Sequence, residues 1–335
     1  MRLSIIVPAY KVEEFIEKCI RSLQEQDVAQ TEYEIIVTND GSPDQSRQIV
    51  ENLQKEFSNL RLINQENQGV SIARNEAIAT AKGKYIMPID PDDFAEQNML
   101  SQLLHQAEST DLDILVAGFE IFDPQGKSIW QTNYSQLAGK VITGVTGYFA
   151  SRGKDVRDPD RSWAILYKRK MIQDYAIDYP KGVPFLEDGC FLVKVFSVAQ
   201  NVGFADSIFY KRTTTEGSAT VSGVFYTEKA INGFIAAAVN LRTFSTKNKL
   251  SQNQQGLINH GIVKYVLLSL FQNVNLKSIG RFSHIVAKLK AHGIVKLPIQ
   301  GVVEPYDKYA KYFNVSPYLF FLLYSKENII AKYLK

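Results

Sequence analysis

The sequence contains few of the residues that cross-link small proteins or bind zinc. Among 335 residues there are two cysteines, Cys19 and Cys190, and they form neither a disulfide framework nor a CxxC pair. We therefore expect a reducing, cytoplasmic compartment. The four histidines are far apart, with no HExxH or HxH group, which disfavours a zinc hydrolase.

Several common binding motifs are also missing. "VPAYKVEEF" stands where a dinucleotide-binding GxGxxG is expected after the first strand, and no GxxxxGK[ST] phosphate loop occurs. An EF-hand beginning at Asp90 would need Gly and Glu where Ala95 and Ser101 stand. The first apolar run is too short for a signal peptide and is broken by Pro8, and we expect no membrane-spanning segment. Dinucleotide oxidoreductases, P-loop enzymes and calcium sensors are thus disfavoured.

Acidic residues are scarce in the last third of the chain. From Arg242 to Lys335 there are 14 Lys and Arg against three acids, which leaves 24 basic and 32 acidic residues before it. The net charge of +3 therefore hides an acidic first part and a basic tail. A tail of this charge suits an anionic partner. It contains no recognisable nucleic-acid reader motif, so we expect no nucleic-acid partner.

Apolar patterning in the first 90 residues predicts alternating strands and helices. Short β-rich runs begin at Leu3, Tyr33, Leu60 and Lys84, and each of the first three is followed by a helical segment. The helices are expected near 12–23, 49–57 and 69–83. Such alternation predicts an α/β fold with a mostly parallel sheet flanked by helices.

Carboxylates follow two of these strands directly. Asp40 ends the second strand, and Asp90, Asp92 and Asp93 follow the apolar run "YIMPI". Ligands of open α/β sheets bind at the carboxyl ends of strands, and three neighbouring carboxylates are well compensated by a divalent cation. The alternative is a solvated turn in which Asp92 or Asp93 caps a helix over 94–104.

Five segments resemble those of one enzyme family in order and spacing. They are "SIIVPAYKVEEFIEKCIRSLQEQ", "EIIVTNDGSPDQS", "NQGVSIARNEAI", "GKYIMPIDPDDF" and "FLEDGCF". The chain thereby resembles the inverting family 2 glycosyltransferases of GT-A fold over roughly residues 1–220. The resemblance implies transfer of a sugar from a nucleotide-diphosphate donor, usually a UDP-sugar, to an acceptor hydroxyl. A sugar-phosphate nucleotidyltransferase is the alternative, although no Gly- and Arg-rich phosphate loop follows the first strand.

The resemblance also implies donor-binding residues. The backbone of Pro8, Ala9 and Tyr10 would line the base pocket, and Asp40 would accept a hydrogen bond from the imide N–H of uracil, where cytosine has an acceptor. Arg74 would lie beside the nucleotide. A common turn aspartate and a surface arginine are the plain alternatives for Asp40 and Arg74.

"DPDD" takes the place of the family's DxD motif. Asp90 would hold the ribose hydroxyls, and Asp92 would bind Mg²⁺ or Mn²⁺, two cations that both favour oxygen ligands. Pro91 departs from the usual small or polar middle residue. It stiffens the loop and leaves both carboxylates in place.

Asp188, next to Glu187, resembles the general base of the family. An inverting transfer needs a base opposite the leaving group, and the alternative is a carboxylate favoured by the start of a buried helix over 189–199. Lys211, Arg212 and Ser218 lie in a stretch that folds over the diphosphate in similar enzymes. For Trp163 we favour a place in the core over stacking on an acceptor sugar.

The resemblance ends near residue 225, and we expect a catalytic domain over 1–222 and a mostly helical basic region over 223–335. A buried helix is predicted at 256–274 and an amphipathic basic one at 282–298. The end, from residue 316, combines aromatic, leucine and lysine residues. This pattern suits a peripheral enzyme at an anionic membrane, acting on a glycan or lipid-linked acceptor. A helical cap or a homodimer interface is the alternative.

Overall fold

The structure is a computed structural model that describes residues 1–152, 160–214, 227–271, 274 and 278–333. The described chain forms two compact units. The sheet unit comprises Met1–Lys181 and Val198–Ser218, and the helical unit comprises Gly182–Ser197 and Ala219–Lys335. The domain boundary expected between residues 222 and 223 stays a prediction.

Four parallel strands form one half of the sheet. In spatial order they are β3 (Leu60–Gln65), β2 (Tyr33–Asp40), β1 (Leu3–Ala9) and β4 (Tyr85–Pro88). All residues of β1, β2 and β4 are buried, as expected of strands covered on both faces. The predicted strand-helix alternation is confirmed. It brings the carboxyl ends of β1, β2 and β4 to the same edge.

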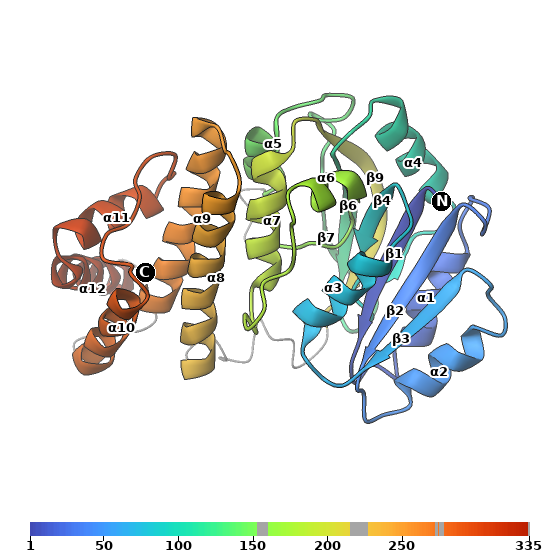
Figure 1. Cartoon of the computed structure of the whole chain (residues 1–335), viewed down its shortest axis with the longest axis horizontal. Helices are drawn as coiled ribbons and strands as arrows, with labels where there is room; N and C mark the ends of the chain where they lie inside the picture. Colours follow the sequence, from blue (N-terminus) through green and yellow to red (C-terminus); the bar gives the residue numbers. More distant parts are fainter. Residues whose placement is uncertain (153–159, 215–226, 272–273, 275–277, 334–335) are drawn as a thin grey trace. The chain divides into compact units, whose positions relative to one another are not determined.

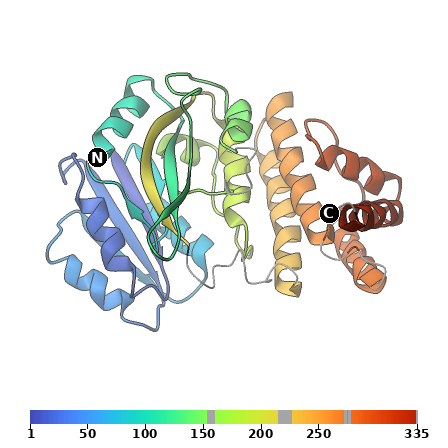
Figure 2. The ribbon, with the colours of Figure 1, turned by 180° about the vertical axis from the view of Figure 1, so that it is seen from behind.

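Helices cover both faces of this half. α3 (Val70–Thr80) lies in front of the strands in Figure 1, and α1 (Ile16–Gln24) lies in front of them in the opposite view of Figure 2. α2 (Ser46–Leu53) packs beside α1. The helix expected from residue 12 begins only at Ile16, and the N–H groups of residues 11–13 donate to side chains of residues 42–46, at 2.7 to 3.1 Å. These bonds tie two turns at the carboxyl edge together.

The other half of the sheet mixes strand directions. β8 (Ile165–Lys168) runs antiparallel between β4 and β6 (Ile114–Phe122), and β9 (Val202–Thr213) follows parallel to β6. β7 (Ser128–Gln131) pairs with β6 off the main path. Most paired residues of the described sheet still lie in parallel ladders, so the expected mostly parallel sheet flanked by helices is confirmed.

The prediction that a helix begins at residue 94, directly after the aspartates, is wrong. Phe94–Ala95 forms a short strand, β5, which pairs antiparallel with β9. α4 (Leu100–Ser109) begins five residues later, so neither Asp92 nor Asp93 caps it. Backbone pairing with β9 takes the N–H and C=O groups that a helix would need. The sheet unit also contains α5 (Gly144–Ala150) and α6 (Arg169–Asp174).

The described part of the helical unit consists mostly of helices. They are α7 (Glu187–Val198), α8 (Glu228–Lys247), α9 (Gln252–Phe271), α10 (Ile279–Ala291), α11 (Tyr306–Val315) and α12 (Pro317–Tyr333). α7, α8 and α9 meet at Gly261, where an added Cβ would lie 2.9 Å from Leu241 and Val193. The buried helices predicted near 189–199 and 256–274 are confirmed. None of the described helices combines the length and apolar character needed to cross a membrane.

Candidate active site

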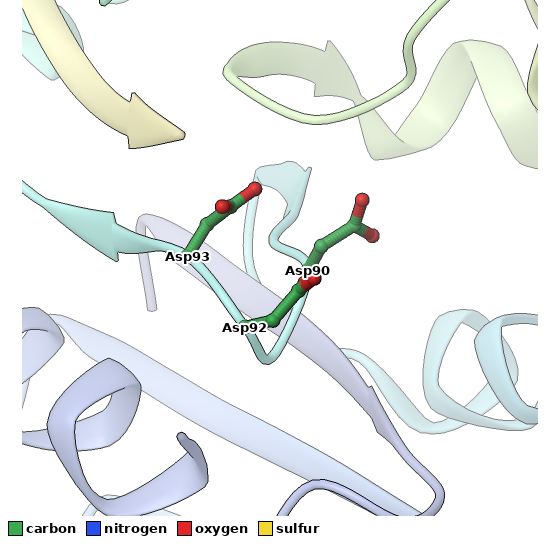
Figure 3. A group of neighbouring side chains, drawn as sticks. All are labelled: Asp90, Asp92 and Asp93. Carbon is green, nitrogen blue, oxygen red and sulfur yellow. The ribbon is translucent and has the colours of Figure 1, made fainter. Parts of the chain in front are cut away.

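Three aspartates gather in the loop between β4 and β5. Asp90, Asp92 and Asp93 each offer a carboxylate oxygen, and these oxygens lie within 4.8 Å of one another (Figure 3). Asp90 and Asp92 are half-buried, and Asp93 is buried. Like charges this close, held partly out of water, form the kind of site that a divalent cation stabilises.

Asp90 is held by a buried arginine. Arg74, on α3, is 4% exposed, and its Nη2 lies 2.7 Å from Asp90 Oδ1. Its guanidinium also lies over the ring of Tyr179, 5.1 Å from the centroid. Burial raises the pKa of Asp90, and the positive charge of Arg74 opposes that shift. The predicted Arg74 is therefore an internal residue that orients Asp90, not a surface arginine.

Asp93 is turned toward β9. Its Oδ2 accepts a hydrogen bond from the hydroxyl of Tyr210 at 2.6 Å, and its Oδ1 accepts one from the N–H of Thr213 at 2.9 Å. Burial, together with the charges of Asp92 and Asp90, raises the pKa of Asp93 well above its usual range. Sequence reasoning missed Tyr210 because no local pattern links it to a residue 117 positions away.

Asp92 and Arg212 are electrostatically coupled. Burial raises the pKa of Asp92, and the positive charge of Arg212 lowers it. Arg212 acts on Asp90 in the same direction. Since both oxygens of Asp93 already accept hydrogen bonds, the carboxylates of Asp90 and Asp92 are the ones suited to face a cation. The donor set fits Mg²⁺ or Mn²⁺, which favour carboxylate oxygens.

Asp40 organises the loop that precedes α3. It is 3% exposed, and its carboxylate accepts hydrogen bonds from Gln65 Nε2 and from the N–H groups of Gln68 and Gly69, at 2.7 to 2.8 Å. A carboxylate has about four acceptor sites, so these three bonds leave room for one more donor. Asp40 thus holds the loop that leads into α3.

A cavity of about 360 Å³ joins these elements at the carboxyl edge of the sheet. Six predicted residues line it: Pro8, Ala9, Tyr10, Asp40, Asp90 and Asp92. The other lining residues are Pro91 and four residues of 67–73, which sequence reasoning did not identify. Gly69 could have indicated these residues from the sequence, because a glycine after "NQ" and before a helix is typical of a tight turn. Its φ is 90° in the structure.

The remaining predicted residues lie elsewhere. Lys211 does not line this cavity; its Nζ lies 2.8 Å from carboxylate oxygens of both Glu96 and Glu120. Its neighbour Arg212 points to the other face, as successive strand residues do. Ser218 is outside the described residues. Glu187 and Asp188 form the first turn of α7, in the helical unit.

Trp163 is part of the core, as expected. It is 4% exposed and stacks on Tyr210 with ring centroids 4.3 Å apart. A side chain in this position is not available to an acceptor sugar. It instead supports the tyrosine that contacts Asp93.

The sheet order, with clustered carboxylates after its central strand β4, defines an α/β fold of the GT-A type. Comparison with known proteins then gives the family. Residues 4–169, just under half of the chain, match the family model described as Glycosyl transferase family 2, and this part of the chain is a domain of that family. The resemblance drawn from the five sequence segments is confirmed.

Individual relatives agree with this assignment. The chain is 34% identical over 210 residues to EpsJ, an uncharacterized glycosyltransferase of Bacillus subtilis strain 168, covering 62% of this chain and 60% of EpsJ. It is 27% identical over 220 residues to TarS, a poly(ribitol-phosphate) beta-N-acetylglucosaminyltransferase of Staphylococcus aureus, covering 65% of this chain and 36% of TarS. The chain thus spans less than two thirds of the length of these relatives.

A solved structure supports the fold. The structure of S. aureus TarS residues 1–349 in complex with UDP-GlcNAc superposes with a TM-score of 0.70 at 20% identity, covering 99% of this chain and 92% of that one. The expected GT-A fold is therefore confirmed.

Proposed function

We propose that the chain is an inverting glycosyltransferase. It transfers a sugar from a nucleotide-diphosphate donor, a UDP-sugar, to a hydroxyl of a growing polysaccharide or lipid-linked glycan. The proposal is supported by the glycosyl transferase family 2 domain and by the UDP-GlcNAc bound to the structurally similar TarS. Its main support is the cavity lined together by Asp40, Asp90 and Asp92.

The donor would lie along the carboxyl edge of the sheet. The backbone of Pro8, Ala9 and Tyr10 forms one wall of the cavity, and Asp40, at its side, has one acceptor site left for an imide N–H. Asp90, oriented by Arg74, is assigned to the ribose hydroxyls. Asp40 would therefore select uracil over cytosine. Asp90, by binding the ribose, would place the diphosphate of the donor next to Asp92.

Asp92 is assigned to Mg²⁺ or Mn²⁺. When bound, such a cation offsets the negative charge that the departing diphosphate gains. Asp92 suits this role because its carboxylate sits beside that of Asp90 in a partly buried loop, where burial raises its pKa. Arg212, whose charge acts on both carboxylates, is assigned to the same diphosphate. Lys211 and Ser218, also expected near the diphosphate, stay predictions: Lys211 does not line the cavity, and Ser218 lies outside the described residues.

Asp188 is assigned as the general base that takes the proton of the acceptor hydroxyl as its oxygen attacks. Support comes from its place in the "LEDG" segment and from its position in the first turn of α7, where the helix start fixes a carboxylate. Base assistance of this kind contributes about 10² to 10⁴ in rate.

Thermal unfolding with uridine nucleotides tests the proposal. UDP should raise the Tm in the presence of Mg²⁺ or Mn²⁺ more than in their absence, since a ligand at 100 times its Kd stabilises by about 2.7 kcal/mol. CDP is the matched control, and should stabilise less if Asp40 reads the imide. A Tm indifferent to uridine nucleotides with both metals supplied would contradict the proposal.

A sugar-phosphate nucleotidyltransferase is the alternative reaction for the same cavity. The two differ in their products. A glycosyltransferase releases UDP from a UDP-sugar, whereas the alternative releases pyrophosphate when UTP and a sugar 1-phosphate are supplied. Screening UDP-sugars for UDP release, with pyrophosphate assayed in parallel, distinguishes them.

The helical unit is assigned to the acceptor side, at an anionic membrane surface on the cytoplasmic face. Seven of the eleven large apolar residues exposed in the described chain lie in this unit, which also contains the basic tail. Apolar and basic groups together suit an anionic lipid surface. A homodimer interface is the alternative use of the same residues. Flotation with anionic and with neutral vesicles, beside the oligomeric state in solution, distinguishes the two.

A further inference from the structure

One buried hydroxyl contacts both ends of the aspartate loop. The Tyr210 side chain, on β9, is fully buried. Its hydroxyl donates to Asp93 Oδ2 at 2.6 Å and accepts from the backbone N–H of Asp90 at 3.2 Å. Asp92 lies between Asp90 and Asp93 in this loop (Figure 3), so the hydroxyl constrains the loop on either side of the proposed metal-binding carboxylate.

The ring that carries this hydroxyl is fixed by aromatic packing. Trp163 stacks on Tyr210 at 4.3 Å with an angle of 10° between the rings. Phe119 meets Trp163 edge-on at 4.9 Å, and the guanidinium of Arg161 lies 5.2 Å from the Trp163 ring centroid. All four side chains are buried. The hydroxyl is therefore held in place by the core, independently of any ligand.

Asp93 differs from Asp90 and Asp92 in that both of its oxygens are held by β9. Both of its oxygens accept hydrogen bonds from β9, one from Tyr210 and one from the N–H of Thr213. Through these two hydrogen bonds, the position of β9 fixes the position of the loop that contains Asp93. Partners that orient metal ligands commonly change metal affinity by about 10- to 100-fold when removed.

We propose that Tyr210 and Asp93 are positioning residues, which fix the loop so that Asp90 and Asp92 face the nucleotide and its metal. The inference rests on the proposed function, because it presupposes a metal-nucleotide site at Asp92. It assigns Asp93 a task distinct from that of the adjacent Asp92. It also makes β9 a support of the donor site, through the hydrogen bond between Tyr210 and Asp93.

The test measures UDP affinity by calorimetry with and without saturating Mn²⁺, and takes the ratio of the two Kd values as the metal enhancement. Tyr210→Phe removes the hydroxyl and keeps the ring stack. It should reduce the metal enhancement about 10-fold, and it should weaken metal-free UDP binding, which involves Asp90 but not the metal, by a smaller factor. Tyr85→Phe is the matched control, because Tyr85 is equally buried and its hydroxyl donates to Ala107 O and Leu112 O, away from the cavity.

A second pair of variants separates positioning from ligation. Asn at position 93 keeps one oxygen that accepts from Tyr210 and loses the oxygen that accepts from the N–H of Thr213, so Asp93→Asn should keep part of the metal enhancement. Asp92→Asn should abolish it. Equal loss in both variants would make Asp93 a ligand and overturn the inference, as would a Tyr210→Phe enhancement within twofold of wild type.

The wild-type measurement shows which proposal has failed. Wild-type protein that binds no uridine nucleotide under either condition contradicts the proposed function, and this inference with it. UDP binding without metal enhancement contradicts the metal assignment and therefore also the positioning role. Metal enhancement in wild type that Tyr210→Phe does not alter contradicts the positioning role alone.

Discussion

The two units of the chain differ in charge and in what they expose. The sheet unit has 22 basic and 29 acidic residues, and three of these acids form the loop between β4 and β5, whereas the helical unit has 16 basic and six acidic residues. The sheet unit exposes four large apolar residues in its described part, against seven in the helical unit. The proposed donor chemistry and the proposed surface association therefore depend on different residues in different units, with Asp188, a proposed catalytic residue in the helical unit, as the exception.

The largest expected effect tests that exception. Asp188→Asn, in the helical unit, should lower kcat by about 10² to 10⁴ while the Kd for the UDP-sugar stays within twofold, because a general base acts on the acceptor proton. Asp307→Asn, in the same unit, is the control, since Asp307 pairs with Lys311 one turn away on the exposed α11. Steady-state UDP release and donor titration measure both. Equal kcat in the two variants would remove the helical unit from the chemistry.

A smaller effect is expected from the ion pair under the donor site. Arg74→Gln leaves the Asp90 carboxylate without its buried partner and should lower the free energy of unfolding by about 2 kcal/mol, discounted because Asp90 is 27% exposed. Urea unfolding followed by tryptophan fluorescence reports this, since Trp130 and Trp163 both belong to the sheet unit.

Arg47→Gln is the control for that measurement. Arg47 pairs with Glu51 on the exposed surface of α2, where such a pair contributes about 0.3 to 0.5 kcal/mol. Similar losses from both arginines would mean that Arg74 is not the internal support of Asp90.

A pH-dependent effect is expected at the opposite end of the sheet. Burial alone would raise the pKa of Glu34, but hydrogen bonds from Arg61, Ser4 and the N–H of Lys82 outweigh it, and the pKa lies below its ordinary value of 4.5. Its contribution is therefore complete above pH 4.5 and is lost as the pH falls through the lowered pKa.

Glu34→Gln should accordingly cost about 1 to 2 kcal/mol of unfolding free energy at pH 7 and progressively less below pH 4.5. Urea unfolding of both proteins across this range measures the difference. A difference that does not shrink with acidity would show that the charge of Glu34 contributes nothing.

The smallest expected effect concerns an exposed apolar residue of the helical unit. Leu322 is 59% exposed on α12, and Leu322→Ser should weaken binding to anionic vesicles by about 1 kcal/mol, or roughly fivefold, without altering UDP affinity. Ile129→Ser, an exposed apolar change on β7 of the sheet unit, is the control. Vesicle binding unchanged in Leu322→Ser, together with a lost dimer, would favour the homodimer interface.

The sequence predicted the donor edge of the sheet well because the signals there are local. Apolar runs mark buried strands, and the residues that follow them reach the carboxyl edge whatever the rest of the fold does. Asp40, Asp90 and Asp92 were found in this way, Pro8 was found through the family resemblance, and all four line one cavity. The buried Trp163 was also anticipated, from its size and surroundings.

Other predictions failed or stayed untested where distant segments pair. Nothing near Phe94 indicated that it would pair with β9, which removed the helix expected there. Lys211 carried the right charge for a diphosphate, but its strand position directs it to Glu96 and Glu120. The role of Asp188 remains a prediction.

By itself, the sequence determined the strand-helix alternation of the first 90 residues and the carboxylates that follow its strands, since burial of apolar side chains imposes a period that can be read along the chain. The tertiary structure alone decided that β8 inserts antiparallel between β4 and β6, and that Tyr210 reaches Asp93. These arrangements depend on pairings between residues far apart in the chain. Many contacts together stabilise them, so no local sequence pattern predicts them.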